Sequence, residues 1–162
     1  MAEEIQLVVF MLRHGDMVCE YGVPITQVQE IITMTRPTQL PQAPDFVEGI
    51  INLRGKIIPI VDLKKRFHMG TSDITNDTRS VVVEVEGQTV GVIVDEVSEV
   101  LRLANSDIEP APAVIGGITA EYLTGVGKIE GRLLILLDMN KILTDQEKAN
   151  LVGVANVEEQ VL

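Results

Sequence analysis

The sequence predicts a mainly β protein made of two small barrels, and three observations support this prediction. Short aliphatic segments alternate with turn-forming Gly, Pro, Asn and Asp, which is typical of short strands joined by tight connections. Hydrophobic residues make up 46% of the 162 residues and aromatic residues only 3%. The core must therefore be aliphatic, and its Val and Ile favour strands. The third observation is an internal repeat of the strand-like segments.

The strand-like segments follow one another along most of the chain. They cover residues 6–12, 17–25, 28–34, 57–61, 80–85, 89–94 and 132–138. The end of the chain has a different pattern, because Thr144 and Glu147 have the spacing of a capping box, in which each side chain bonds a free backbone N–H of the first helical turn. This spacing predicts a helix from Asp145 to about Glu159, weakened by Gly153.

One part of the repeat lies at the end of each half. Residues 52–67 align with residues 128–143 at a constant offset of 76 positions, which pairs Asp62 with Asp138. Apolar positions match throughout the block, and a glycine and a lysine match as well. A single aligned block could arise by chance among aliphatic strands.

A second part of the repeat lies earlier in each half. Residues 22–31 align with residues 91–100 at an offset of 69 positions, which pairs Val28 with Val97. Two blocks in the same order, with matching glycines and acids, make a duplication the better explanation.

A duplication of about 65–70 residues made of short strands predicts two barrels packed side by side, because closing each sheet removes its exposed edges. We expect one domain over residues 1–162, with subdomains at about 6–69 and 79–143 and a C-terminal helix or tail at 144–162. Duplicated barrels can exchange strands, so residues 6–12 could pair within either half. The junction between the barrels is expected to form an aliphatic groove that suits an amphipathic helix of a partner.

Composition excludes several classes of function. The net charge of −11 and the lack of stacking aromatics argue against nucleic-acid binding. Cys19 is the only cysteine, which rules out an internal disulfide and suits a reducing cytoplasm. The first residues lack the pattern of a signal peptide, and apolar runs of about five residues are too short to insert into a membrane.

No set of residues predicts catalysis or a cofactor. Asp62 and Asp138 could form a carboxylate pair of a hydrolase, but each follows a strand and begins a turn or short helix, so capping explains both. His14, His68 and Cys19 lack the spacing of metal ligands. No phosphate-binding loop or serine elbow occurs. We therefore expect a protein that is not an enzyme and has no metal or cofactor.

Arg54 is the charged residue with two open interpretations. It lies in a polar turn between apolar segments, and Glu130 takes its place in the second half. It could be a solvated residue at a hairpin tip or an arginine of a protein interface, where Arg is favoured. A barrel that binds oligonucleotides or small ligands is a further alternative, but it would need a basic, aromatic face.

Six motifs together resemble the CheW family of bacterial chemotaxis coupling proteins, over about residues 6–151. The family module also occurs in the regulatory domain of the CheA kinase, and the short chain points to the free adaptor. From about residue 150 onward the chain has little family signature. The motifs are VQEI at 28–31, GIINLRG at 49–55, IPIVDL at 58–63, VGVIVD at 90–95, VSEV at 97–100 and EYLTG at 121–125.

The resemblance implies two SH3-like five-stranded barrels and an adaptor without catalysis. Such an adaptor joins the cytoplasmic hairpin tip of chemoreceptors to the regulatory domain of the CheA histidine kinase. It is cytoplasmic and is recruited to membrane-associated receptor arrays. Positions that match the family motifs imply a kinase-binding set, Asn52, Leu53 and Arg54. They also imply a receptor-binding set, Val28, Glu30, Gly49, Val97 and Val100.

Overall fold

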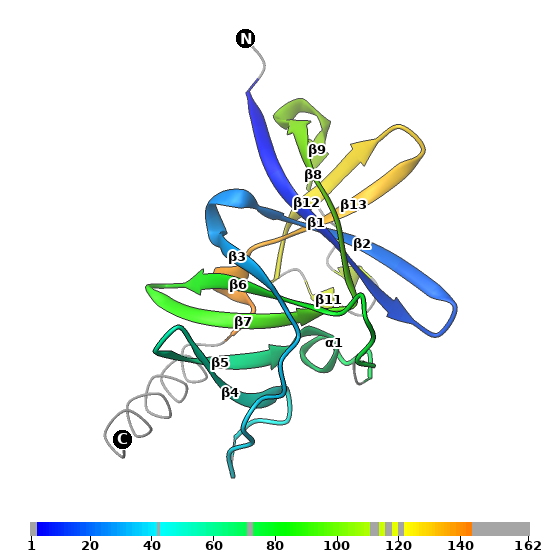
Figure 1. The fold of residues 1–162 in the computed structure, drawn as a ribbon. Coiled ribbons are helices and arrows are strands. Elements are labelled where there is room, and N and C mark those ends of the chain that lie inside the picture. The colour runs from blue at the N-terminus through cyan, green and yellow to red at the C-terminus, as the bar shows by residue number, and fades with distance from the viewer. Residues whose placement is uncertain are drawn as a thin grey trace.

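The computed structural model describes residues 3–41, 43–70, 73–110, 114–115, 118–119 and 122–143, and it is almost entirely β (Figure 1). Eleven of the strands form two sheets. The first sheet has the order β3 (Val28–Thr33), β6 (Arg79–Val85), β7 (Gln88–Val94), β5 (Lys56–Asp62) and β4 (Val47–Leu53). The second has the order β8 (Glu96–Ala104), β1 (Glu4–His14), β2 (Met17–Pro24), β13 (Arg132–Leu137), β12 (Leu123–Ile129) and β9 (Ile108–Glu109).

The remaining elements are short. The strands β10 (Val114–Ile115) and β11 (Ile118–Thr119) form a separate pair. One helical turn, α1 (Leu63–Arg66), follows β5. The 3₁₀ turns whose bounds lie within the described residues are η1 (Ile25–Gln27), η2 (Asn105–Asp107) and η4 (Met139–Lys141).

The five-stranded sheet closes on itself through the chain that follows β3. Thr38 and Ile50 of β4 exchange two backbone hydrogen bonds, of 2.8 and 2.9 Å, so the continuation of the first strand of the sheet pairs with its last strand. In the six-stranded sheet β9, which follows β8 through η2, pairs with β12 in the same way. We call these closed units the first barrel (β3, β6, β7, β5, β4) and the second barrel (β8, β1, β2, β13, β12, β9).

Each barrel takes strands from both halves of the chain. The strands β1 and β2 precede all strands of the first barrel but pair with β8 and β13 in the second. Conversely, β6 and β7 come from the second half and complete the first barrel. Residues 6–69 and 79–143 therefore each contribute strands to both barrels, which is the exchange that the sequence left open.

The register of the strands follows the sequence repeat. The parallel pairing of β5 with β7 sets Ile60 opposite Gly91, and the pairing of β13 with β2 sets Leu136 opposite Gly22. Ile60 and Leu136 are 76 positions apart, and Gly22 and Gly91 are 69 positions apart, as in the two aligned sequence blocks. The repeat thus corresponds to two equivalent barrels that exchange strands and are related by an approximate twofold axis.

The strands that each half contributes to the other barrel, such as β1 and β6, are buried on both faces. Alternate residues of β6, such as Val82, face a small cluster inside the first barrel, whereas Val81 and Val83 belong to a cluster that both barrels share. The same holds for β1, where Val9 lies in the cluster inside the second barrel and Phe10 lies in the shared one. This arrangement explains why these strands read as continuous apolar runs rather than alternating ones. We call the shared cluster the seam; it includes residues such as Phe10, Tyr21, Val61, Phe67, Val81, Val92, Leu137 and Ile142.

The two repeated aspartates are helix caps. A side-chain oxygen of Asp62 accepts a hydrogen bond from the backbone N–H of Lys64 (3.0 Å), and Asp138 accepts one from Asn140 (3.0 Å). The expected C-terminal helix at residues 144–162 lies outside the described residues. In the part of the chain that is described, no helix has the length and apolarity to cross a membrane.

Candidate partner-binding surface

The β4–β5 hairpin carries Asn52, Leu53 and Arg54 at its tip. Its loop consists of Arg54 and Gly55, and both residues have positive φ, of 52° and 88°. Two positive φ values are typical of the tight type I′ turn, where a non-glycine residue is uncommon. The side chain of Asn52 accepts a hydrogen bond from the N–H of Gly55 (2.8 Å) and so stabilises the turn. The hairpin therefore holds Arg54 at a defined place on the surface.

Arg54 forms an ion pair with Glu30 on β3. One guanidinium nitrogen of Arg54 lies 2.5 Å from both carboxylate oxygens of Glu30. The Arg54 side chain is 68% exposed and that of Glu30 is 29% exposed. The structure thus brings together one residue of the expected kinase-binding set and one of the expected receptor-binding set. Because Arg54 is so exposed, the pair adds little to stability, and its guanidinium keeps open faces for another molecule.

Gly49 has a structural role that the sequence did not reveal. It is buried in β4 with φ of 145°, next to the backbone bridge between Thr38 and Ile50. A Cβ added at Gly49 would lie 2.1 Å from the carbonyl oxygen of Thr38. Only glycine allows the two backbones to approach this closely, so Gly49 is required for closure of the first barrel.

The valines of the expected receptor-binding set lie on repeat-equivalent strands of different barrels. Val28 on β3 and Val97 on β8 are half-buried, and both pack against the seam. Val100 on β8 is 52% exposed. Its repeat equivalent on β3, Ile31, is 40% exposed. Ile31 is a candidate that the sequence reasoning missed, although the offset of 69 positions was a signal that pointed to it.

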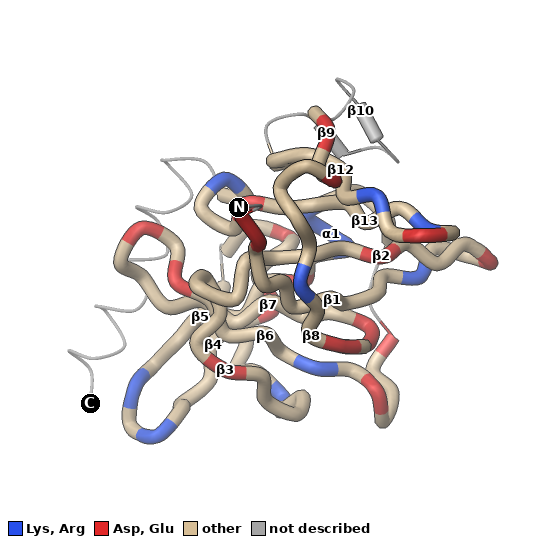
Figure 2. The backbone as a smooth tube through the Cα atoms, turned by 90° about the horizontal axis from the view of Figure 1, so that it is seen from above, with Lys and Arg blue, Asp and Glu red and all other residues tan. Residues whose placement is uncertain are grey.

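The equivalent hairpin of the second barrel has different charges. Glu130 stands at its tip, and the cation is supplied by Arg132, which pairs with Glu99 at 3.1 Å and Glu20 at 3.0 Å. Glu99 is the repeat equivalent of Glu30. The equivalent strands β3 and β8 therefore each have an acid paired with an arginine. Only in the first barrel does that arginine lie at the hairpin tip. Acidic and basic positions are spread over both barrels (Figure 2).

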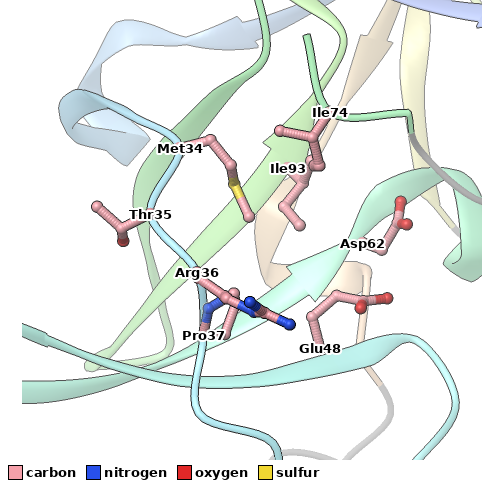
Figure 3. Close-up of a pocket in the computed structure, with 8 residues that line it drawn as sticks. All are labelled: Met34, Thr35, Arg36, Pro37, Glu48, Asp62, Ile74 and Ile93. Carbon is pink, nitrogen blue, oxygen red and sulfur yellow. The ribbon is translucent and has the colours of Figure 1, made fainter.

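Two hollows lie away from the Val28 and Val97 positions. One, of about 370 Å³, lies at the mouth of the first barrel, where Arg36 extends toward Glu48 over an apolar floor that includes Met34 and Ile93 (Figure 3). Glu48 pairs with Lys65 at 2.6 Å, and this contact raises the pKa of Lys65 above its usual value. The other, of about 710 Å³, lies between β2 and β13 and is lined by Val18, Arg132 and Leu133 among others.

The residues considered for catalysis or metal binding have other contacts. Asp62 and Asp138 cap different turns, and Asp138 also accepts a hydrogen bond from the side-chain amide of Gln27 (3.1 Å). The His14 ring bonds the carbonyl of Met69, and Cys19 is half-buried against the seam. Within the described ranges, no group of three or more His, Cys, Asp or Glu is arranged to hold a metal ion.

Comparison with known proteins identifies relatives over most of the chain. A family model described as the CheW-like domain matches residues 6–147. The chemotaxis protein CheW of Klebsiella aerogenes is 40% identical over 136 residues, which cover 84% of this chain and 82% of the relative. The chemotaxis protein CheW of Treponema pallidum is 37% identical over 155 residues, which cover 93% of this chain and 89% of the relative.

A solved structure has the same architecture. The crystal structure of the scaffolding protein TtCheW from Thermoanaerobacter tengcongensis superimposes with a TM-score of 0.80 at 37% sequence identity. The match covers 91% of this chain and 92% of that chain. The overall fold therefore has a solved counterpart.

Proposed function

This chain belongs to the CheW-like family, and on that premise we propose that it is a non-catalytic adaptor that couples chemoreceptors to the CheA histidine kinase. Its relatives are named as chemotaxis proteins, and a structural relative is named as a scaffolding protein. The observation that carries the proposal is the exposed Arg54, held at the tip of the β4–β5 hairpin and paired with Glu30.

The proposed kinase contact is made by Asn52, Leu53 and Arg54. Asn52 and Arg54 are exposed and Leu53 is half-buried, so the hairpin offers an apolar side chain beside a guanidinium. Arg is favoured at the centre of interfaces because its planar fork donates several hydrogen bonds. The turn pre-organises this residue, which lowers the entropy lost on binding.

The proposed receptor contact involves Val28, Glu30, Gly49, Val97 and Val100. The exposed Val100 supplies apolar area, whereas Val28 and Val97 join that surface to the seam. A receptor tip made of amphipathic helices suits an aliphatic surface of this kind. Gly49 contributes indirectly, because it keeps the first barrel closed beneath the surface.

The proposed mechanism is scaffolding. A protein that binds two partners at once raises the effective concentration of one at the other, so it needs no catalytic group. The capping contacts of Asp62 and Asp138 are consistent with this, since they explain both carboxylates without a reaction. We propose that the adaptor acts in the cytoplasm, recruited to receptor arrays at the membrane, and uses no cofactor.

The test is a pair of binding measurements with an isolated kinase regulatory domain and an isolated receptor tip. Arg54→Glu is expected to weaken kinase binding about 30-fold, the effect of losing an interface arginine worth about 2 kcal/mol. Val100→Lys is expected to weaken receptor binding and leave kinase binding unchanged. Equal kinase affinities for Arg54→Glu and the parent protein would refute the assignment of Arg54.

Two further variants make the result specific. Lys128→Glu reverses a charge on the equivalent hairpin of the second barrel, where the side chain is 51% exposed, and should not affect kinase binding. The double variant Glu30→Arg, Arg54→Glu retains an ion pair with its charges exchanged. If that double variant binds the kinase normally, Arg54 acts through Glu30 and not by touching the kinase.

A further inference from the structure

Arg66 lies where equivalent parts of the two barrels meet. Its guanidinium carbon is 5.1 Å from the ring centre of Phe46 and 5.1 Å from that of Tyr122. These rings are repeat equivalents, 76 positions apart, and they precede β4 in the first barrel and β12 in the second. The Nε of Arg66 donates a hydrogen bond to the carbonyl of Ile142 (2.5 Å), and Ile142 is the repeat equivalent of Arg66 itself.

This geometry places the guanidinium close to the approximate twofold axis. It is equally far from two equivalent rings and is bonded to its own counterpart, so it contacts both barrels at once. An arginine that lies over two aromatic rings is attracted by the quadrupoles of both. A hydrogen bond from a charged group to a carbonyl adds a direction to that attraction.

Apart from a row of contacting aromatic rings, the seam around Arg66 holds the barrels together without fixing their orientation. It consists mainly of Val, Leu and Ile side chains, and burial of aliphatic surface is non-directional. Aliphatic cores lose a unique arrangement before they lose stability when their specific contacts are removed. A polar contact at the axis can therefore decide which of several similar alignments the barrels adopt.

Other polar contacts also join the barrels and would survive a change at Arg66. Gln27, next to β3, accepts a hydrogen bond from the backbone of Met139 (3.0 Å) and donates one to Asp138. The Asp95 carboxylate pairs with Lys64 at 3.5 Å and accepts a hydrogen bond from the backbone of Arg13 (2.7 Å). The barrels are therefore expected to stay folded and attached without Arg66.

We propose that Arg66 is a positioning residue that fixes the orientation of the two barrels relative to each other. It does so by contacting the rings of both Phe46 and Tyr122 with one guanidinium, which is also hydrogen-bonded to the carbonyl of Ile142. The consequence is a set angle between the β4–β5 hairpin of the first barrel and the exposed face of β8 in the second. This inference does not rest on the proposed function, because it is tested by a distance within the chain.

The experiment measures distances between spin labels by pulsed electron paramagnetic resonance. Labels at Glu84→Cys in the first barrel and Glu130→Cys in the second report the orientation of the barrels. Labels at Thr35→Cys and Glu84→Cys report the first barrel alone. All three label positions, Thr35, Glu84 and Glu130, are exposed, and Cys19→Ala removes the native thiol.

Arg66→Gln is expected to broaden or shift the distance distribution between the barrels and to leave the distribution within the first barrel unchanged. Tyr122→Leu, which removes one ring but keeps the arginine, should have the same effect. Tyr122→Phe keeps the ring and Arg102→Gln removes an exposed arginine of β8, so both should match the parent protein.

The outcomes separate positioning from a general role in folding. An unchanged distribution between the barrels in folded Arg66→Gln overturns the proposal, as does equal broadening within the first barrel. If Arg66→Gln does not fold, Tyr122→Leu provides the same measurement with the guanidinium in place. An unchanged distance between the barrels in Tyr122→Leu would also overturn the proposal.

Discussion

The first and second barrels have the same strand order and register but differ in the charges at equivalent places. At the hairpin tip the first barrel has Arg54 and the second has Glu130. At the barrel mouth Glu48 pairs with Lys65, whereas the equivalent of Glu48 is the neutral Thr124. Duplication thus preserved the backbone, where pairing and closure allow little change, and side chains at the surface diverged.

The difference indicates where function is located in a nearly symmetric fold. Features shared by both barrels, such as the aspartate side chains that cap a backbone N–H, stabilise the fold. Features of one barrel only, such as a cation at the hairpin tip, are expected to distinguish the proposed partner surfaces. The following variants test this division by comparing equivalent positions.

The largest effect is expected for Gly49→Ala. Its Cβ would meet the carbonyl oxygen of Thr38 at 2.1 Å, and the φ of 145° is unfavourable for alanine. Backbone strain and overpacking together should lower the free energy of unfolding by about 3 kcal/mol or more. Urea denaturation followed by circular dichroism measures this loss.

Two glycines of the second barrel are the matched controls for Gly49. A Cβ at Gly125, the repeat equivalent, would lie 2.8 Å from the carbonyl oxygen of Glu109, so Gly125→Ala should cost less. Gly131 has φ of 79° with open space around it, so Gly131→Ala isolates the strain of the backbone, about 1 kcal/mol. If all three variants lost the same free energy of unfolding, the close approach of the Gly49 and Thr38 backbones would not be the cause of the loss.

A smaller and symmetric effect is expected for the two caps. Asp62→Ala and Asp138→Ala each remove a side-chain acceptor for a backbone N–H and should each cost about 1 kcal/mol in unfolding free energy. Asp→Asn at the same positions keeps an acceptor oxygen and should recover most of the loss. A cap that can be removed at no cost in either barrel would contradict the structural role assigned to both aspartates.

The smallest effect is expected at alkaline pH. The contact with Glu48 raises the pKa of Lys65 in the folded state, so the folded protein holds that proton more tightly than the unfolded chain. The resulting stabilisation is complete below the unfolded pKa of about 10.4 and is lost as the pH rises through the folded pKa. Its size should be below about 1 kcal/mol because the pair is partly exposed.

Unfolding curves between about pH 9 and pH 11.5 test this expectation. Lys65→Met should be less stable than the parent protein at neutral pH and should lose less stability as the pH rises. Lys141→Met is the matched control, because Lys141 is the repeat equivalent of Lys65 and Thr124 replaces the acid. Parallel pH profiles for the parent protein and Lys65→Met would show that the pair contributes nothing.

Much of the architecture was determined by the sequence itself, because it depends on local patterns. Aliphatic runs between turn residues specified strands, and the positions after the strands specified the caps at Asp62 and Asp138. The offsets of 69 and 76 positions predicted which residues are equivalent, and the parallel pairs Ile60–Gly91 and Leu136–Gly22 follow them. The family motifs pointed to the β4–β5 hairpin and to β3 and β8.

Only the tertiary structure decided which half pairs with which. Both halves offer the same apolar strand edges, so the local pattern is satisfied equally by pairing within a half or across the halves. The contacts of Arg66 with Tyr122 and Ile142 join the two halves and follow from that choice. The contacts of Arg54 with Glu30 and of Gly49 with Thr38 lie within the first half and depend on closure of the first barrel. The energies of all these contacts depend on distances that exist only after the barrels have closed and packed.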